Sequence, residues 1–439
     1  MTPTHTAPYY DRTVFAEGDR KNRSGQAYLY RRAGNQSNVL DFRLRDEIDG
    51  LLLQQALNTA LDCYPYLSSR LIERDGDFYF AANPYPCTVT RTGQLRPLAG
   101  ETVHDHLIDV TWSGRSLCVA FDHALCDGGG LLPFVRTLLC RYFALRYDQE
   151  GNIPGVRLTA PDAAQLSAET AEPMHARFPV DESRLTAPWR GKALRLPESR
   201  KPDGLQQTYY RYEMRISRAS YLALSRRLET SPGVLTALLM SRAVAALHGT
   251  DEPIAAHTAA NIRRVLGFPD TFRNCTRSIP LLYDAGLHAL PLPEQAAAFR
   301  QTLREQCTPD NTRAAANAIV GMSDHLDTLP SLAAKKAAMT FFDDIQMDTY
   351  VLSYLGQLNL GPLDEYLEAL YFYNAGTTGL VLNLADVAGT FCLCFMQSFP
   401  DDCYVNAFST QLAQHGLAGV CSSCIPFTTP RSQMQEPHT

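Results

Sequence analysis

A histidine, an aspartate and a run of glycines stand close together in the segment FDHALCDGGG, residues 121–130. His123 is followed four residues later by Asp127, and Gly128 begins three consecutive glycines. Imidazole is the side chain best suited to take a proton near neutral pH. Asp127 could orient this imidazole, or it could turn away and hold the loop through an arginine. Glycines permit backbone angles that other residues avoid and let a substrate approach closely. The segment therefore indicates a general base.

The elements around this segment favour a functional site. The apolar run 117–121 predicts a strand, and the helical spacing of apolar residues over 131–146 predicts a helix with Pro133 in its first turn. A junction between a strand and a helix presents side chains at the edge of a sheet, where sites are common. The alternative is a buried structural histidine followed by a helix-capping aspartate. About 0.04 chance matches to H-x-x-x-D-G are expected in a chain with this histidine content, which favours the functional interpretation.

The remaining elements fall into two halves separated by a stretch without periodicity, residues 151–204, which is rich in Pro, Ala, Ser and charge. In the first half we expect a helix at 48–61 and strands at 26–32, 38–44, 87–91 and 107–111, with a hairpin over 71–81 that turns at Asp75-Gly76. In the second half we expect strands at 207–216, 254–260, 349–354, 369–373, 380–383 and 390–396, and helices at 218–228, 231–247, 293–306, 331–341 and 401–415. Both halves mix strands with packed helices, which predicts an α+β fold in two parts.

Composition excludes several classes of protein. The chain has 439 residues, enough for two cores, and a net charge of −6, which argues against a broad nucleic-acid surface. It has no apolar run long enough to span a membrane, and its first residues lack the apolar stretch of a signal peptide, so we expect a cytoplasmic protein. The 12 cysteines show no disulfide framework, and the single C-x-x-C pair at 421–424 lacks a second pair, so no metal site is predicted.

The segment His123-Ala-Leu-Cys-Asp127-Gly128 resembles the H-x-x-x-D-G signature of the CoA-dependent acyltransferase superfamily. That superfamily includes chloramphenicol acetyltransferase, condensation domains of nonribosomal peptide synthesis and alcohol acetyltransferases. Four further segments resemble its softer motifs in the same order along the chain: DCYPYLSSRL, NIRRVLG at 261–267, RNCTRSIPL at 273–281 and YVLSYLGQL at 350–358.

The resemblance implies an α+β fold of two chloramphenicol-acetyltransferase-like lobes, each a mixed β-sheet flanked by helices, with a channel between them. We place the first lobe at residues 1–165, a crossover linker at 166–205 and the second lobe at 206–439. In such proteins the signature histidine is the general base that takes a proton from the acceptor as it attacks a thioester, so His123 is expected to fill this role. No cofactor is expected to be bound permanently, because acyl-CoA or a phosphopantetheine thioester serves as co-substrate.

The resemblance also assigns roles to residues around His123. The signature aspartate pairs with an arginine of the other lobe in these proteins, and Arg263 is the match for it, with Arg264 as its rival. Asp127 and Gly128 thus belong to the site together with Arg263.

Ser353, Tyr354 and Asn274 are candidates for donors to the oxyanion or for residues that line the channel. Tyr354 stands where the superfamily has an asparagine, which is a departure from the pattern.

The function that these patterns predict is transfer of an acyl group from acyl-CoA to a hydroxyl or amine of a small acceptor. Many condensation domains carry a second histidine directly before the signature, where this chain has Asp122, which favours simple acyl transfer. One alternative is a condensation-type enzyme that uses a thioester on an acyl or peptidyl carrier protein in natural-product biosynthesis. Another is a non-catalytic binding module with the same fold. Lys335 and Lys336 could contact CoA phosphates or a carrier's phosphopantetheine, or could simply lie on a solvated helix face.

Overall fold

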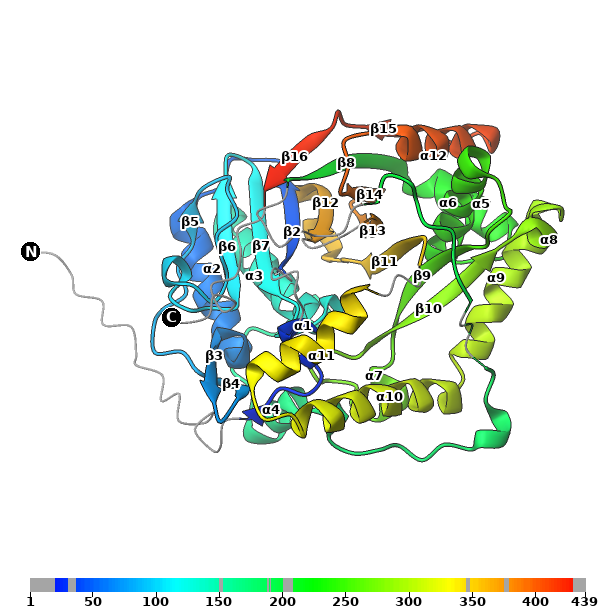
Figure 1. Ribbon diagram of the computed structural model, residues 1–439. Helices are drawn as coiled ribbons and strands as arrows, with labels where there is room; N and C mark the ends of the chain where they lie inside the picture. Colours follow the sequence, from blue (N-terminus) through cyan, green and yellow to red (C-terminus); the bar gives the residue numbers. More distant parts are fainter. Residues whose placement is uncertain are drawn as a thin grey trace, which may run out of the picture.

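The computed structural model describes residues 20–30, 37–149, 153–187, 189, 191–199, 208–344, 348–374 and 379–428 of the chain. Within these residues two large mixed sheets form, one on each side of the molecule, and each has helices packed on one face (Figure 1).

The first sheet has five strands in the order β12-β2-β7-β6-β5, of which only β5 and β6 are parallel. Helices α2 (Gly50–Cys63) and α3 (Gly128–Tyr147) pack against it and against each other, and apolar residues from both helices and from the sheet form one core. Asp49 caps α2 by accepting hydrogen bonds from two backbone N–H groups of its first turn. The strands are β2 (Ser37–Leu44), β5 (Thr90–Arg91), β6 (Ile108–Ser113), β7 (Ser116–Asp122) and β12 (Leu367–Asn374).

The second sheet has eight strands in the order β10-β9-β11-β13-β14-β8-β15, with β16 also paired to β8. Its central helix, α6 (Pro232–His248), is buried along most of its length and is capped by Ser231, whose hydroxyl accepts from the N–H of Val234. The other helices on this lobe are α5 (Arg218–Arg227), α8 (Ala285–His288), α9 (Leu292–Gln306) and α12 (Cys403–Gln414). The strands are β8 (Thr208–Ser217), β9 (Ile254–Asn261), β10 (Thr276–Tyr283), β11 (Tyr350–Gln357), β13 (Leu380–Val387), β14 (Thr390–Gln397), β15 (Gly419–Cys421) and β16 (Ile425–Thr428).

A third layer lies across the two lobes. A small antiparallel sheet joins β1 (Arg20–Lys21), β4 (Asp77–Ala82) and β3 (Ser69–Arg74), and α1 (Gln26–Leu29), α10 (Pro309–Asp327) and α11 (Leu332–Asp344) pack beside it. Figure 1 shows α11 lying between the two large sheets, with α1 next to it. The shorter segments are α4 (Ala163–Thr170), α7 (Arg263–Leu266) and the 3-10 turns Pro65–Ser68, Glu101–Val103, Pro173–His175, Glu182–Arg184 and Gly361–Tyr366.

The chain crosses between the lobes more than once. Strand β12 comes from the later part of the sequence but completes the first sheet by pairing with β2. The lobe boundaries placed at 165/166 and 205/206 remain predictions, and this strand lies outside the simple division that they describe.

Most expected elements match the structure, and the hairpin at Asp75-Gly76 is confirmed, with both turn residues at positive φ. Three expectations were wrong. Within the expected strand 26–32, the described residues 26–29 form helix α1. The expected strand 87–91 is reduced to two residues. Helix α3 begins at Gly128, so the glycines are its first turn and not a loop.

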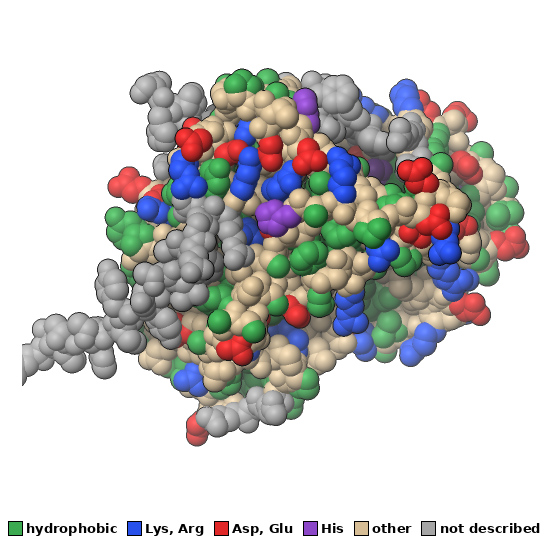
Figure 2. All heavy atoms as spheres, turned by 90° about the horizontal axis from the view of Figure 1, so that it is seen from below, with side chains coloured by type: hydrophobic (Ala, Val, Ile, Leu, Met, Phe, Trp, Pro, Cys, Tyr) green, Lys and Arg blue, Asp and Glu red, His purple; other side chains and the backbone are tan. Residues whose placement is uncertain are grey.

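Two remaining observations concern the charged side chains on one face and the apolar length of the helices. Figure 2 views the molecule from the side on which α10 lies and shows acidic and basic side chains interspersed over this face. Among the described residues no single helix has the length and apolar character to cross a membrane; α5 and α6 would meet that test only as a pair, and they meet at an angle of 83°.

Candidate active site

The carboxylate of Asp127 is buried and makes four hydrogen bonds. One oxygen accepts from the N–H of Gly130 at 2.9 Å, as the cap of α3, and from the Arg263 guanidinium at 2.5 Å. The other accepts from the N–H of Cys275 and the hydroxyl of Thr276, both at 2.8 Å. Every acceptor direction of the carboxylate is therefore used within the protein, and none of these four hydrogen bonds goes to His123.

Arg263 is the partner of Asp127, and Arg264 is exposed. The guanidinium of Arg263 also donates to two backbone carbonyls of the second lobe, those of Thr271 at 2.8 Å and Arg273 at 2.6 Å. Burial by itself raises the pKa of Asp127, but the charge and hydrogen bond of Arg263, together with the N–H groups of Cys275 and Gly130, outweigh this effect and hold the pKa below its usual value. Asp127 thus joins the H-x-x-x-D-G segment of the first lobe to the second lobe through a buried ion pair.

The glycines after Asp127 serve close approach between the lobes. None of the three has a positive φ, so the unusual backbone angles expected from the sequence are not used. A Cβ on Gly130 would lie 2.0 Å from the carbonyl oxygen of Phe272, and a Cβ on Gly128 would lie 2.9 Å from the side chain of Leu355. Only glycine lets the second lobe come this near to the start of α3.

His123 follows β7 directly, and its side chain is partly buried and held by Asn274. The amide nitrogen of Asn274 donates to the carbonyl oxygen of His123 at 2.8 Å, and the amide oxygen lies 3.0 Å from Nδ1 of the ring. Because a backbone carbonyl only accepts, the amide orientation is fixed, and its oxygen requires a proton on Nδ1. Nε2 therefore carries the lone pair, which is the state that a general base needs.

The environment also keeps His123 neutral. Burial lowers the pKa of His123, and the negative charge of Asp127 counters this only in part. Near neutral pH the ring is therefore unprotonated and ready to accept a proton.

A residue that the sequence did not single out completes the surroundings of His123. Tyr28 of α1 stacks on the imidazole, with ring centroids 3.9 Å apart and an angle of 9° between the planes. Sequence reasoning missed it because residues 26–32 were expected to form a strand, and an isolated tyrosine carries no motif.

The two candidates on β11 face in opposite directions. Tyr354 lies in the second core beside Phe391, and a Cβ on Gly233 of α6 would lie 3.4 Å from its ring. Ser353 is on the other face of the strand, together with Leu355, which reaches Gly128. Because side chains alternate along a strand, Ser353 lies on the face of β11 that is turned toward the start of α3, and Tyr354 lies on the opposite face.

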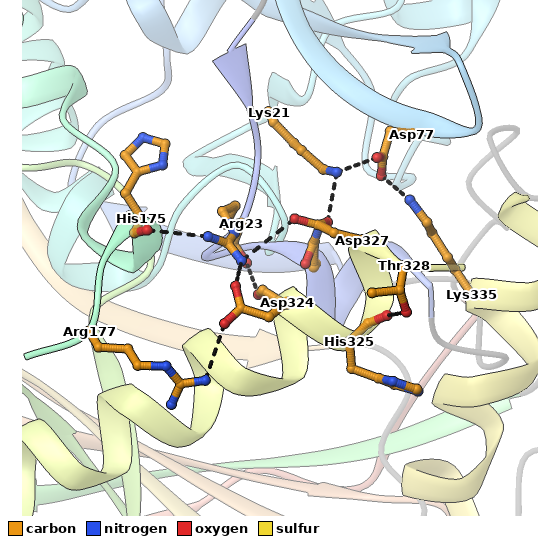
Figure 3. A network of polar contacts seen from close by, with 12 residues as sticks. Lys21, Arg23, Asp77, His175, Arg177, Asp324, His325, Asp327, Thr328 and Lys335 are labelled. Atoms are coloured by element: carbon orange, nitrogen blue, oxygen red, sulfur yellow. Dashed lines mark hydrogen bonds and ion pairs between the residues drawn. The ribbon is translucent and has the colours of Figure 1, made fainter. Parts of the chain in front are cut away.

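Asn274 and Lys335 also have other roles than those expected. The amide of Asn274 is engaged with His123 through both its nitrogen and its oxygen, so Asn274 orients the imidazole and is not a free donor for an oxyanion. Lys335 is only 2% exposed and forms an ion pair with Asp77 at 2.6 Å, which removes it as a contact for CoA phosphates (Figure 3). Lys336, the next residue, stays partly exposed.

Comparison with solved structures finds proteins of the same architecture over nearly the whole chain. Polyketide synthase associated protein 5 from Mycobacterium tuberculosis has a TM-score of 0.58 at 16% identity, covering 89% of this chain and 96% of its own. TRI101 from F. sporotrichioides, solved with coenzyme A and T-2, has a TM-score of 0.58 at 12% identity, covering 92% and 100%. The epimerization domain from the third module of tyrocidine synthetase B has a TM-score of 0.53 at 15% identity, covering 88% and 92%.

No model of a protein family and no curated protein matches the sequence itself. The structural similarity shows that these proteins share a fold with this chain. Because the sequence identities are so low, the similarity does not show a shared chemistry, which depends on the residues of the site.

Proposed function

Because the chain has the two-lobe fold of the CoA-dependent acyltransferases, we propose that it transfers an acyl group from a thioester to a hydroxyl or amine, with His123 as general base. The observation that carries this proposal is the hydrogen bond that Nδ1–H of His123 donates to the amide oxygen of Asn274, which leaves Nε2 of a partly exposed, neutral imidazole as a base where the lobes meet.

The reaction proceeds through one tetrahedral intermediate. Nε2 of His123 takes the proton of the acceptor as its oxygen or nitrogen bonds to the thioester carbonyl carbon. The intermediate then collapses, the C–S bond breaks, and the imidazolium returns the proton to the departing thiolate. The products are an ester or amide and a free thiol, and no acyl-enzyme is formed. A positioned base of this kind contributes roughly 10²–10⁴-fold to the rate.

Asp127 supports this reaction from a distance. Its four hydrogen bonds hold the start of α3 and the 272–276 segment together, and that segment carries Asn274. We assign Asp127, Gly128 and Arg263 to maintaining the geometry of the site. Ser353, which faces the first lobe from β11, is the proposed donor to the oxyanion of the intermediate.

The proposed donor is acyl-CoA as a co-substrate, with a small-molecule acceptor and no permanently bound cofactor. TRI101, which has the same fold, was solved with coenzyme A and a small molecule, and this supports the proposal. The epimerization domain belongs to a peptide synthetase, so a carrier-protein thioester is the second candidate donor. We place the reaction in the cytoplasm, where acyl-CoA is present.

The test is release of free thiol from a series of acyl-CoA thioesters with alcohol and amine acceptors. We expect turnover by the wild-type protein and at least a 100-fold loss in His123→Ala, with a melting temperature close to that of the wild type. Turnover of an acyl-loaded carrier protein but of no acyl-CoA would establish the second candidate. Undiminished transfer by His123→Ala would contradict the role of this residue as base.

A further inference from the structure

The tyrosine stacked on His123 belongs to a segment far from it in sequence. The ring of Tyr28 lies nearly parallel to the imidazole, with the centroids 3.9 Å apart, so it covers one face of the ring and does not block the ring edge itself. Asn274 holds the Nδ1 side of that edge. The imidazole is therefore constrained by two contacts from different parts of the chain.

The segment that carries Tyr28 is fitted directly onto the catalytic segment. The side chain of Asn22 donates to the carbonyl oxygen of Ala124, the residue after His123, at 2.8 Å, and it also accepts from the N–H of Gly25. A Cβ on Gly25 would lie 2.3 Å from the same carbonyl oxygen. Only glycine permits this approach, so the turn before α1 is shaped to the backbone beside His123.

The other side of α1 is anchored in a small apolar core built from both halves of the chain. Leu29 and Tyr30 pack with Ala124 and with residues of β4, α10 and α11, namely Phe78, Leu326 and Met339. Tyr30 also donates a hydrogen bond to Asp77 at 2.8 Å.

Ion pairs fix the same segment to α10 (Figure 3). Lys21 bridges Asp77 and Asp327, and its nitrogen lies 2.7 Å from an oxygen of Asp327. Arg23 pairs with Asp324 of the same helix. Residues 21–30 are thus held at the turn, in the core and at the surface, and Tyr28 presents a fixed ring to His123.

We infer that Tyr28 is a positioning residue for His123, and that the N-terminal segment 20–30 is a working part of the active site. The inference rests on the proposed function for its catalytic meaning, while the contact itself does not depend on it.

Two physical effects follow from the stack. A covering ring restricts rotation of the imidazole about its Cβ–Cγ bond, so Nε2 keeps one direction. The electron-rich face of the tyrosine also stabilises the imidazolium that forms when His123 takes a proton. Both effects act on the base and not on substrate binding, so they are expected in kcat more than in KM.

The other groups near the imidazole do not reproduce these effects. Asp127 is the charged group that acts on His123, and it belongs to the same chain segment. Asp122 comes directly before His123 and accepts from the N–H of Ala124. Asn274, from the second lobe, is neutral. Among these groups only Tyr28 lies over a face of the ring.

The experiment compares Tyr28→Leu, which keeps apolar volume without an aromatic face, with Tyr28→Phe, which keeps the face. With acetyl-CoA and an acceptor that the wild-type protein turns over, we expect kcat to fall about tenfold in Tyr28→Leu with little change in KM. Tyr28→Phe should stay within about twofold of wild type. Equal kcat in the two variants would overturn the inference.

A readout without turnover separates this inference from the proposed function. The imidazole signals of His123, assigned by their loss in His123→Ala, are titrated by NMR. The pKa of His123 should be lower in Tyr28→Leu than in Tyr28→Phe, because the aromatic face no longer stabilises the cation. If the wild-type protein releases no thiol from any thioester, the proposed function fails, but this titration still decides whether Tyr28 acts on His123. An unchanged pKa would contradict the inference.

A matched control removes a stack of the same geometry elsewhere. Tyr147 and Tyr366 stack with centroids 3.8 Å apart and an angle of 8°, at the far end of α3 from His123. Tyr366→Ala should leave both kcat and the titration of His123 unchanged. A loss of activity in this variant equal to that in Tyr28→Leu would mean that the effect reflects general destabilisation, and it would overturn the role of Tyr28.

Discussion

At the scale of single residues, the two ionisable groups of the signature do different work. The carboxylate of Asp127 accepts hydrogen bonds from backbone N–H groups and from Arg263, and it thereby connects the two lobes. His123 receives its orientation from Asn274 and Tyr28. The sequence allowed Asp127 either to orient the histidine or to turn away to an arginine, and the structure has the second arrangement.

The amide of Asn274 sets the proton state of His123, and its replacement by a carboxylate should change the pH dependence of the reaction. In Asn274→Asp a negative charge would lie beside Nδ1 and stabilise the imidazolium. The pKa of His123 should rise, so the unprotonated base would form only at higher pH. We expect the acidic limb of the profile of kcat/KM against pH to move to higher pH, as measured by thiol release.

The comparison for this variant is Asn274→Ala, which removes the hydrogen bond without adding charge. It should lower kcat without moving the acidic limb upward. Superimposable profiles for Asn274→Asp and the wild type would show that Asn274 does not act on the base.

At the scale of elements, the sequence predicted those whose pattern is local. The N-cap of helix α6, its Pro232 and its long apolar stretch can all be recognised in the amino-acid sequence, and so can the turn of the hairpin at Asp75-Gly76. Helix α1 could not be predicted, because its four residues depend on packing against Ala124 and α10. Helix α10 was missed because alanines and polar residues dilute its apolar spacing.

The site followed the same rule. The pairing of Asp127 with Arg263 was predicted from a resemblance and is confirmed as a contact. The direction of Tyr354 depends on strand register, and the stack of Tyr28 depends on tertiary packing, so neither could be inferred from spacing.

The close approach at the first turn of α3 gives a prediction about Gly130. An added methyl group would lie 2.0 Å from the carbonyl oxygen of Phe272, which is a backbone atom and cannot turn aside as the end of a flexible side chain can. We expect Gly130→Ala to lower the free energy of unfolding by about 1–3 kcal/mol, as for overpacking, despite the higher helix propensity of alanine. Urea denaturation followed by circular dichroism measures this change.

Gly93 provides the control, because a Cβ there would meet only the Ser113 side chain at 3.9 Å. Gly93→Ala should leave the unfolding midpoint within experimental error of wild type. If Gly130→Ala were as stable as Gly93→Ala, the glycine run would not be required for packing of the lobes.

At the scale of the whole molecule, segments far apart in sequence hold the lobes together. Strand β12 completes the first sheet from the later half of the chain, and Arg211 of β8 lies 3.5 Å from Asp41 of β2 across the two sheets. Asp77 of β4 joins Lys335 of α11 and Lys21 of β1. The architecture therefore depends on contacts that close long loops, and loosening one of them should affect both lobes.

Asp77 is the most informative of these contacts, because its loss would strand a buried cation. Lys335 is 2% exposed, so Asp77→Ala would leave its ammonium group away from water without a carboxylate at this position. We expect the free energy of unfolding to fall by about 3–5 kcal/mol, measured by urea denaturation. In Asp77→Ala/Lys335→Met no ammonium group is stranded, so the double variant should recover a substantial part of this loss.

Lys336→Ala serves as the control on the same helix and should leave stability unchanged, since the side chain of Lys336 is partly exposed. Of the two lysines 335 and 336, only Lys336 has an ammonium group that is not held in this ion pair, so a raised KM for acyl-CoA in Lys336→Ala would identify it as a contact of the acyl donor. Equal losses of stability in Lys336→Ala and Asp77→Ala would refute the buried ion pair as the bridge.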